Sequence, residues 1–200
     1  MASNDPSKGR PVFAARTVGA ATPGEPHRTV HCATSRRGSR SRDSSGNLAT
    51  HDALTGLYNR AYLDTECERL DRGRAHPIGV LVADADGLKR VNDLLGHHAG
   101  DALLCRSAAV LASSFRGDDV IARAGGDEFV VLLPGHDAAA VLRARERLDA
   151  AVRVHAVRSP ISISVGDALC VAGEPVRDAL RRADQAMLVQ KHRRRAGREP

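Results

Sequence analysis

Four carboxylates in two short segments are the residues best suited to chemistry. Asp84 and Asp86 close the apolar run 77–86, and Asp127 and Glu128 stand side by side after two glycines in the segment 123–133. A magnesium site needs hard oxygen donors on a rigid frame, and Mg2+ commonly takes one or two carboxylates and leaves its other positions to water and phosphates. The alternative is a tight hairpin turn whose acidic side chains are simply solvated.

The segments around these carboxylates predict alternating strands and helices. Apolar residues at helical spacing predict helices over residues 59–73, 99–115, 137–155 and 176–192. In the first of them Asn59 is expected to be the N-cap and Gly73 to end the helix. Short apolar runs bounded by turn residues predict strands over residues 77–86, 119–125, 128–135 and 161–169.

From residue 78 onward the predicted order is strand, helix, strand, strand, helix, strand, which is the split βαβ arrangement. We therefore predict the α+β class: a ferredoxin-like βαββαβ core with an antiparallel central sheet, its helices on one face, and extra N- and C-terminal helices. In this topology the first strand and the hairpin are neighbours. Asp84 is then expected to approach Asp127.

Composition predicts one domain preceded by a tail. The chain has 200 residues and is 42% hydrophobic, which is enough for one full-sized domain. Residues 1–48 are rich in Arg, Ser and Gly and have no apolar period, so we expect a disordered tail, either passive or in electrostatic contact with a partner. The folded domain is then expected over residues 49–197.

The net charge of +6 is concentrated at the two ends, because residues 51–190 carry 17 Lys and Arg against 20 Asp and Glu. This acidic middle and the 2% aromatic content argue against a nucleic-acid partner. Four cysteines without metal-ligand spacing predict reduced thiols. With no signal peptide or apolar run of membrane-span length, we expect a cytoplasmic protein without a membrane span.

Six segments resemble, in order and spacing, the GGDEF family, the diguanylate cyclases that condense two GTP into cyclic di-GMP. They read DALTGLYNR at 52–60, DADGLKRVNDLLGHHAGD at 84–101, RGDD at 116–119, GGDEF at 125–129, SISVG at 162–166 and ADQAMLVQK at 183–191. The resemblance covers about 150 residues and implies a palm-like nucleotidyl-cyclase fold.

The resemblance also implies roles for individual residues. Metal ligands are Asp84, Asp127 and the backbone carbonyl of Ala85, and Glu128 positions or deprotonates the attacking hydroxyl. The guanine edge is bound by Asn92 and Asp101, with Leu104 lining the base pocket. Phosphates are bound by the backbone N–H groups of Gly87 and Leu88, in the turn after Asp84, and by the cationic side chains of Lys89, Lys191 and Arg195. Gly126 lets a ligand come close to the backbone.

The reaction implied is in-line attack of a ribose 3′-hydroxyl on the α-phosphorus of a second GTP, with release of pyrophosphate. It uses two Mg2+ ions per active site, with Mn2+ as an alternative. Because one domain holds one GTP, catalysis requires a homodimer. Arg116 and Asp119 resemble the family's RxxD inhibitory site for the product, assisted by one of Arg143, Arg145 or Arg147.

Other interpretations stay open at the level of sequence. Asn92 and Asp101 could be helix-capping residues, the cations at the C-terminal helix could only balance its dipole, and Arg116 and Asp119 could form a local ion pair. A domain without turnover could act as a cyclic di-GMP receptor through the latter two residues. Nothing in residues 1–50 resembles a sensor domain.

The chain also departs from the family pattern. Leu188 stands where the family usually has Tyr, Gln190 where it has a small residue, and residues 194–196 read Arg-Arg-Ala where it has Gly-Arg-Asn. Gly87 and Leu88 replace an aromatic pair that often precedes the motif lysine. None of these changes removes an implied metal ligand, but they weaken the phosphate role transferred to Arg195.

Overall fold

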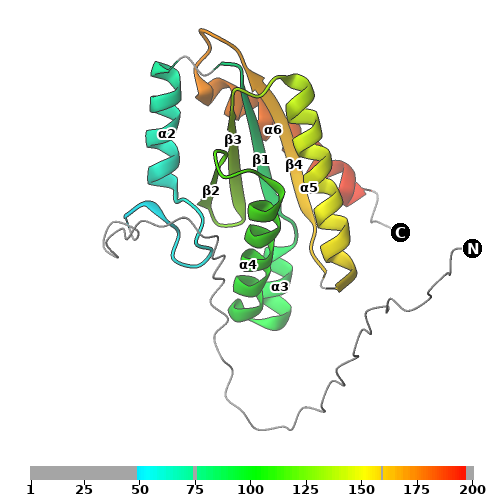
Figure 1. Ribbon diagram of the computed structural model, residues 1–200. Helices are drawn as coiled ribbons and strands as arrows, with labels where there is room; N and C mark the ends of the chain where they lie inside the picture. Colours follow the sequence, from blue (N-terminus) through cyan, green and yellow to red (C-terminus); the bar gives the residue numbers. More distant parts are fainter. Residues whose placement is uncertain (1–48, 74–75, 159, 197–200) are drawn as a thin grey trace, which may run out of the picture. The chain divides into compact units, whose positions relative to one another are not determined.

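The computed structural model describes residues 49–73, 76–158 and 160–196, so the predicted tail 1–48 lies outside the described residues. The elements follow the chain in the order α2 (Arg60–Arg72), β1 (Ile78–Ala85), α3 (Leu88–Leu95), α4 (His97–Ser114), β2 (Val120–Gly125), β3 (Glu128–Pro134), α5 (Ala138–Arg158), β4 (Ile163–Cys170) and α6 (Val176–Ala196) (Figure 1). The first helix begins and ends as predicted, because the Asn59 side chain accepts from the Tyr62 N–H and Gly73 is its C-cap.

The four strands form one antiparallel sheet in the order β2-β3-β1-β4. This is the predicted ferredoxin-like topology, in which β1 and the β2–β3 hairpin become neighbours although a crossover separates them in the chain. The first crossover contains two helices, α3 and α4, which meet at Gly96. The α+β fold and its antiparallel core are therefore confirmed.

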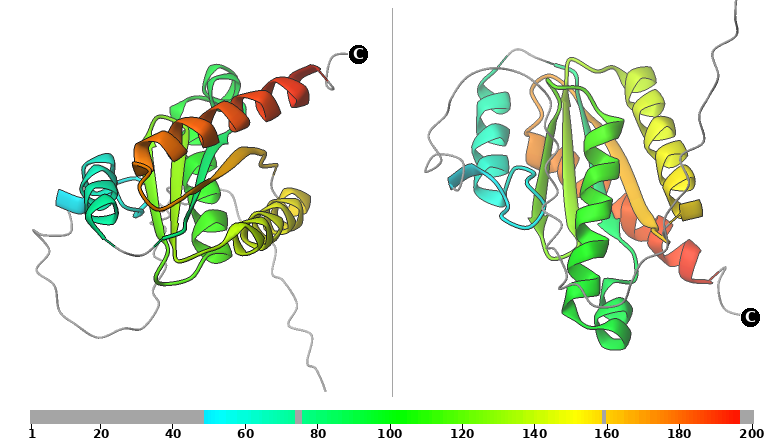
Figure 2. Two further views of the ribbon diagram at one scale, coloured as in Figure 1. Left: turned by 90° about the horizontal axis from the view of Figure 1, so that it is seen from above. Right: turned by 60° about the horizontal axis from the view of Figure 1, so that its bottom comes forward.

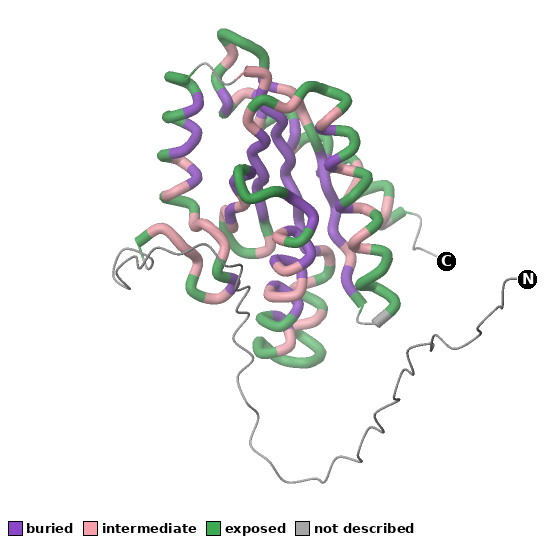
Figure 3. The backbone as a smooth tube through the Cα atoms, in the orientation of Figure 1, coloured by how far each residue is buried: buried purple, intermediate pink, exposed green. Residues whose placement is uncertain are grey.

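Helices cover both faces of the sheet (Figure 2). The crossover helices α4 and α5 pack on one face, as predicted, whereas α2 and α6 pack on the other. The prediction placed only the helices of the βαββαβ core on one face, and α2 and α6 are the extra N- and C-terminal helices of that prediction. As a consequence β1 is buried along its whole length (Figure 3).

Strand alternation decides which way the side chains of β1 point. Leu81 and Ala83 belong to the core under α4 and α5, whereas Val80 and Val82 belong to the core under α2 and α6. Asp84 continues the second series. Asp84, the acidic residue of β1, is therefore directed toward the α6 side of the sheet.

Helix α6 also satisfies polar backbone groups of the edge strand β4. The Arg182 guanidinium donates to the Leu169 carbonyl at 2.7 Å, the Gln190 Oε1 accepts from the Val165 N–H at 2.5 Å, and the Arg194 guanidinium donates to the Ile163 carbonyl at 2.7 Å. Successive outward-facing groups of β4 are thus occupied by side chains from one helix.

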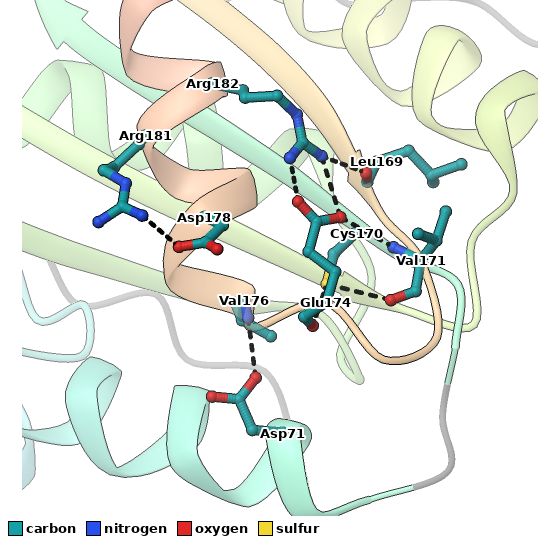
Figure 4. A network of polar contacts seen from close by, with 9 residues as sticks. All are labelled: Asp71, Leu169, Cys170, Val171, Glu174, Val176, Asp178, Arg181 and Arg182. Carbon is teal, nitrogen blue, oxygen red and sulfur yellow. Dashed lines mark hydrogen bonds and ion pairs between the residues drawn. The ribbon is translucent and has the colours of Figure 1, made fainter.

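The start of α6 is fixed by acidic side chains (Figure 4). Asp71 Oδ1, from the end of α2, accepts from the Val176 N–H at 2.8 Å, which satisfies one of the free donors at a helix N-terminus. Glu174 forms an ion pair with Arg182. These contacts fix the N-terminal end of α6 near the C-terminal end of β4.

Candidate active site

Carboxylates from two distant segments meet at the ends of β1 and β3. Asp84 lies directly opposite Glu128 in the strand register, and the Ala85 N–H donates to the Asp127 carbonyl at 2.9 Å. Directly opposed residues of an antiparallel pair have Cβ atoms about 4.5–5.5 Å apart. The predicted approach of these acidic residues is therefore what the fold produces.

Asp84 is buried, with 3% of its surface exposed, and among the described residues only one of its oxygens has a partner. Its Oδ2 receives the Lys191 ammonium at 2.6 Å, whereas its Oδ1 is buried without a hydrogen-bond partner. Burial raises the pKa of Asp84, and the hydrogen bond from Lys191 opposes that rise. A buried oxygen without a partner is costly unless a ligand satisfies it.

Glu128 is exposed at the start of β3 and has a different environment. Partial burial raises its pKa above the ordinary range, and the neighbouring carboxylates Asp184, Asp127 and Asp84 raise it further. Glu128 and Asp184 both line a pocket of about 320 Å³ between α2 and α6. A carboxylate with a raised pKa at the mouth of a pocket has the properties expected of a proton acceptor.

The turn between β2 and β3 is held by Arg123. Gly126 has φ +50°, a left-handed conformation that glycine adopts without strain, and its carbonyl accepts from Arg123 Nε at 3.0 Å and Nη2 at 2.7 Å. Arg123 Nη1 contacts both carboxylate oxygens of Asp52, at 3.1 and 3.2 Å. Neither Arg123 nor Asp52 was predicted from the sequence to have a role, although Asp52 opens the first recognised motif.

The donor set fits a hard divalent cation. No group of three or more His, Cys, Asp and Glu side chains suited to a metal occurs within residues 49–73, 76–158 and 160–196. Mg2+ does not need such a group, because one or two carboxylates suffice when water and substrate phosphates complete its coordination. The unpartnered Oδ1 of Asp84, with Asp127 and the end of β1 beside it, meets that requirement.

Asp86, the fourth carboxylate predicted to join the site, has a structural role instead. Its Oδ2 accepts from Ser162 Oγ at 2.7 Å and its Oδ1 from Ser164 Oγ at 2.8 Å, while the Arg194 guanidinium lies 3.4 Å from Oδ2. Both oxygens are thereby occupied. Asp86 ties the end of β1 to the start of β4 and does not join the other three acids.

The predicted base-binding residues lie where α3 and α4 pack together. Within the part of the chain that the structure describes, Asn92 Oδ1 is buried without a partner, and it lies so close to Gly100 that a Cβ added there would be 1.9 Å from it. Asp101 is exposed on α4, and Leu104 is buried in the core under that helix. Helix capping does not explain Asn92 or Asp101, since the N-caps of α3 and α4 are glycines.

The predicted phosphate-binding residues surround the start of α3. Gly87 is its N-cap with φ +84°, Leu88 is its first residue, and Lys89 is exposed. Lys191 is held by Asp84, as described above. Arg195 belongs to α6, but its side chain lies outside the described residues.

The sequence of this chain matches a protein-family model. The sequence model described as "Diguanylate cyclase, GGDEF domain" matches residues 49–197. The chain belongs to the GGDEF family. The recognition made from the six motifs is thereby confirmed.

Similar proteins and structures agree with this assignment. The GGDEF domain is 42% identical over 153 residues to an uncharacterized protein of Mycobacterium tuberculosis, covering 72% of this chain and 24% of that protein. It is 41% identical over 128 residues to the response regulator PleD of Caulobacter vibrioides, covering 62% of this chain and 27% of PleD. The chain therefore spans about a quarter of the length of these curated relatives.

Solved structures of diguanylate cyclases have the same fold. The GGDEF domain of DgcB from Caulobacter crescentus, in complex with c-di-GMP, matches with a TM-score of 0.66 and 31% identity, covering 78% of this chain and 94% of that one. Diguanylate cyclase SiaD from Pseudomonas aeruginosa, in complex with its activator SiaC, matches with a TM-score of 0.67 and 31% identity, covering 74% of this chain and 60% of that one.

The RxxD segment of this GGDEF domain forms a turn beside a second pocket. Asp119 is buried and its Oδ2 accepts from the Arg116 backbone N–H at 2.7 Å, so the pair is joined through the backbone. The exposed Arg116 lines a pocket of about 390 Å³ together with Arg147 from α5. Arg145 instead pairs with Asp149 and Asp167, and Arg147 is the one of the three arginines of the prediction that lines this pocket.

Within the described part of this GGDEF domain, no helix is both long enough and apolar enough to cross a membrane.

Proposed function

We propose that this GGDEF domain is a diguanylate cyclase that condenses two GTP into cyclic di-GMP and releases pyrophosphate. The observation that supports it most is the pairing of Asp84 with Glu128 across β1 and β3, beside Asp127. The c-di-GMP complex of the similar DgcB domain supports the same nucleotide class. We place the activity in the cytoplasm, where GTP is available.

In the proposed reaction Glu128 accepts or orients the proton of the attacking 3′-hydroxyl, which its raised pKa favours. Mg2+, two ions per site with Mn2+ as an alternative, would be held by Asp84, Asp127 and the Ala85 carbonyl and would polarise the phosphates. The phosphates are bound by the backbone at Gly87 and Leu88 together with Lys89, Lys191 and Arg195, and Gly126 allows close approach.

Recognition of guanine is assigned to Asn92 and Asp101. The buried Asn92 Oδ1 has no partner among the described residues, so it offers an acceptor that a base can satisfy. Asp101 presents a carboxylate suited to the N1 and N2 donors of guanine, and Leu104 provides an apolar contact. Because each domain offers one such site, two copies must meet to join two nucleotides, and we propose a catalytic homodimer.

The decisive experiment is incubation of the purified chain with GTP and Mg2+, followed by measurement of cyclic di-GMP and pyrophosphate. Asp127→Asn and Glu128→Gln are each expected to reduce turnover by about 10²-fold or more, because each removes a group from the reacting centre. Glu146→Gln, an exposed change on α5, is the matched control. Near-normal turnover of Glu128→Gln with an unchanged fold would refute the assignment.

A second candidate function is binding of cyclic di-GMP without turnover, favoured by the pocket that Arg116 and Arg147 line. In an active enzyme this pocket would mediate product inhibition through Arg116 and Asp119. Arg116→Ala and Arg147→Ala are then expected to raise activity about tenfold when product is abundant. Unchanged inhibition in both variants, measured at a fixed product concentration, argues against an inhibitory site there.

A further inference from the structure

The pocket of about 320 Å³ between α2 and α6 is a second place for a ligand beside Glu128. Its strand residues come from β1, β2 and β3. Gly87, where the proposed phosphate-binding segment begins, lines a different cavity together with residues that precede β4, which lies on the other side of β1 in the sheet. The two cavities have no lining residue in common. A ligand in the first pocket therefore does not compete with one bound at the start of α3.

The pocket between α2 and α6 has an apolar floor and a charged rim. The apolar lining residues are Leu63, Val82, Ala124, Val130 and Leu180. The charged ones are the exposed arginines Arg60, Arg177 and Arg181 and the acids Asp64, Glu128 and Asp184. An apolar floor lowers the local dielectric constant, which strengthens the attraction between a cationic rim and an anionic ligand.

In the described part of the chain these arginines are held only by exposed ion pairs. Arg60 and Arg177 share Asp64, with nitrogen–oxygen distances of 3.2 and 3.1 Å, and Arg181 pairs with Asp178 (Figure 4). Each of these contacts uses one guanidinium nitrogen, so the other nitrogens remain available. Because exposed ion pairs contribute little to stability, the three guanidinium groups can turn to an anion at small cost.

The cations lie away from the reacting end of the pocket. Asp184 marks that end, since it lies close enough to Glu128 to raise its pKa. Arg181 and Arg177 precede Asp184 by about one and two turns on the same side of α6, so Arg177 is about 10 Å from it along the helix axis. Positive charge therefore increases along the pocket with distance from the acids.

We propose that Arg60, Arg177 and Arg181 bind the pyrophosphate end of the second GTP, the one that a partner copy brings to Glu128. The inference rests on the proposed function, because the ligand is taken from that reaction. Guanidinium groups bind phosphate oxygens in pairs and with defined geometry, which suits a polyphosphate. The partner copy holds the nucleotide by its base, and this pocket holds the end that leaves.

The direction of attack agrees with this arrangement. The 3′-oxygen forms a bond to the α-phosphorus while its proton leaves toward Glu128, and the bond to the leaving oxygen breaks with the electron pair remaining on pyrophosphate. In-line attack places the leaving oxygen opposite the attacking hydroxyl, and thus away from Glu128. The negative charge that develops there is stabilised by the arginines.

The test uses 3′-deoxy-GTP, which lacks the attacking hydroxyl and so binds without reacting. Sedimentation velocity with Mg2+ measures the nucleotide concentration at which half of the chain is dimeric. Arg60→Gln and Arg177→Gln are each expected to raise this concentration about tenfold, since each removes a charge-assisted contact. With 3′-deoxy-GMP, which has no pyrophosphate end, the variants are expected to behave as the wild-type chain does.

Two further variants separate phosphate binding from a structural role. Each single arginine variant leaves Asp64 with its other arginine, so both are expected to fold. Asp64→Asn removes the carboxylate that competes for both guanidinium groups, and it is expected to lower the half-dimer concentration about threefold. Arg153→Gln, an exposed change on α5 against the opposite face of the sheet, is the charge-matched control.

The proposal is overturned if wild-type chain saturated with 3′-deoxy-GTP stays monomeric, if both arginine variants associate as the wild-type chain does, or if Arg153→Gln loses as much. An Asp64→Asn variant that is weakened like Arg60→Gln also overturns it, because the ion pair would then be structural. Association that needs these arginines, in a chain that makes no cyclic product from GTP, supports the pocket and refutes the cyclase. Cyclisation at the wild-type rate by both arginine variants does the reverse.

Discussion

Gly100 leaves space for the Asn92 side chain and for little else. A methyl group at this position would lie 1.9 Å from Asn92 Oδ1, so Gly100→Ala is expected to turn that side chain away from the place where it could meet a base. The expected result is a loss of GTP affinity of about tenfold, corresponding to one lost hydrogen bond, with a folded domain. Calorimetric titration with GTP measures it.

Gly117→Ala is the control for this change, because a Cβ there would meet nothing within 4 Å. If Gly100→Ala binds GTP as well as the control does, Asn92 has no part in base recognition. Thermal melting of both variants shows whether the packing of α3 on α4 survives.

Glu128 is a residue at which function and stability oppose each other. Its pKa is raised by partial burial and then by Asp184, Asp127 and Asp84, so its ionised form is disfavoured in the folded state. This penalty is present above the folded pKa, decreases as the pH falls, and is absent once the group is protonated in both the folded and unfolded states.

Glu128→Gln is therefore expected to raise the melting temperature of the metal-free domain at neutral pH, by roughly 1–3 °C after solvent screening is considered. The difference from the wild-type chain should vanish near pH 3. Scanning calorimetry in EDTA across this pH range is the measurement, with Glu146→Gln for comparison. A variant that is less stable than the wild-type chain at pH 7 would contradict the electrostatic account.

At the scale of elements, Arg123 joins the segment before α2, through Asp52, to the β2–β3 turn, through Gly126. Burial opposes ionisation of Asp52, but hydrogen bonds from Thr55 and Arg123 outweigh it and lower its pKa. Ionised Asp52 therefore stabilises the folded state fully at a pH above its pKa in the unfolded chain, and this stabilisation is lost as the pH falls through its lower pKa in the folded chain. The same guanidinium holds the Gly126 carbonyl, so a single side chain fixes both the segment and the turn.

Arg123→Gln is expected to cost about 1–3 kcal/mol of stability, because it leaves the partly buried Asp52 carboxylate without its cation. Turnover should fall together with the order of the turn that carries Asp127. Denaturant unfolding at pH 7 and near pH 2 measures the first effect, and the loss should be smaller at the acidic pH, where Asp52 is protonated in the unfolded chain and increasingly so in the folded one. An Arg123→Gln chain with wild-type stability and turnover would show that the turn holds without this contact.

The sequence was sufficient for the strands, the topology and the meeting of Asp84 with Asp127, because periodicity and connection order determine them. It was insufficient where a partner far along the chain decides the outcome. The hydroxyls of Ser162 and Ser164 occupy both oxygens of Asp86, so this residue does not belong to the acidic group at the site. These contacts cannot be predicted from the residues next to Asp86 in the sequence. Which arginine of α5 lines the pocket beside Arg116 depends on how α5 is rotated against the sheet.

For the whole molecule, the proposed function, with one site per domain, predicts that activity depends on association. Specific activity of the purified chain is expected to rise with protein concentration and to level off once the catalytic dimer is saturated. Turnover assays over a dilution series, with sedimentation velocity on the same samples, test this. Specific activity that stays constant while the chain is monomeric would rule out a catalytic dimer.

The contacts that α6 makes with β4 also limit how such a dimer can form. An exposed edge strand normally offers its backbone to a strand of another chain, which leads to sheet extension or fibrils. Here Arg182, Gln190 and Arg194 already occupy outward groups of that edge. Two copies are therefore expected to associate without pairing their β4 strands, an association that can be reversed by dilution.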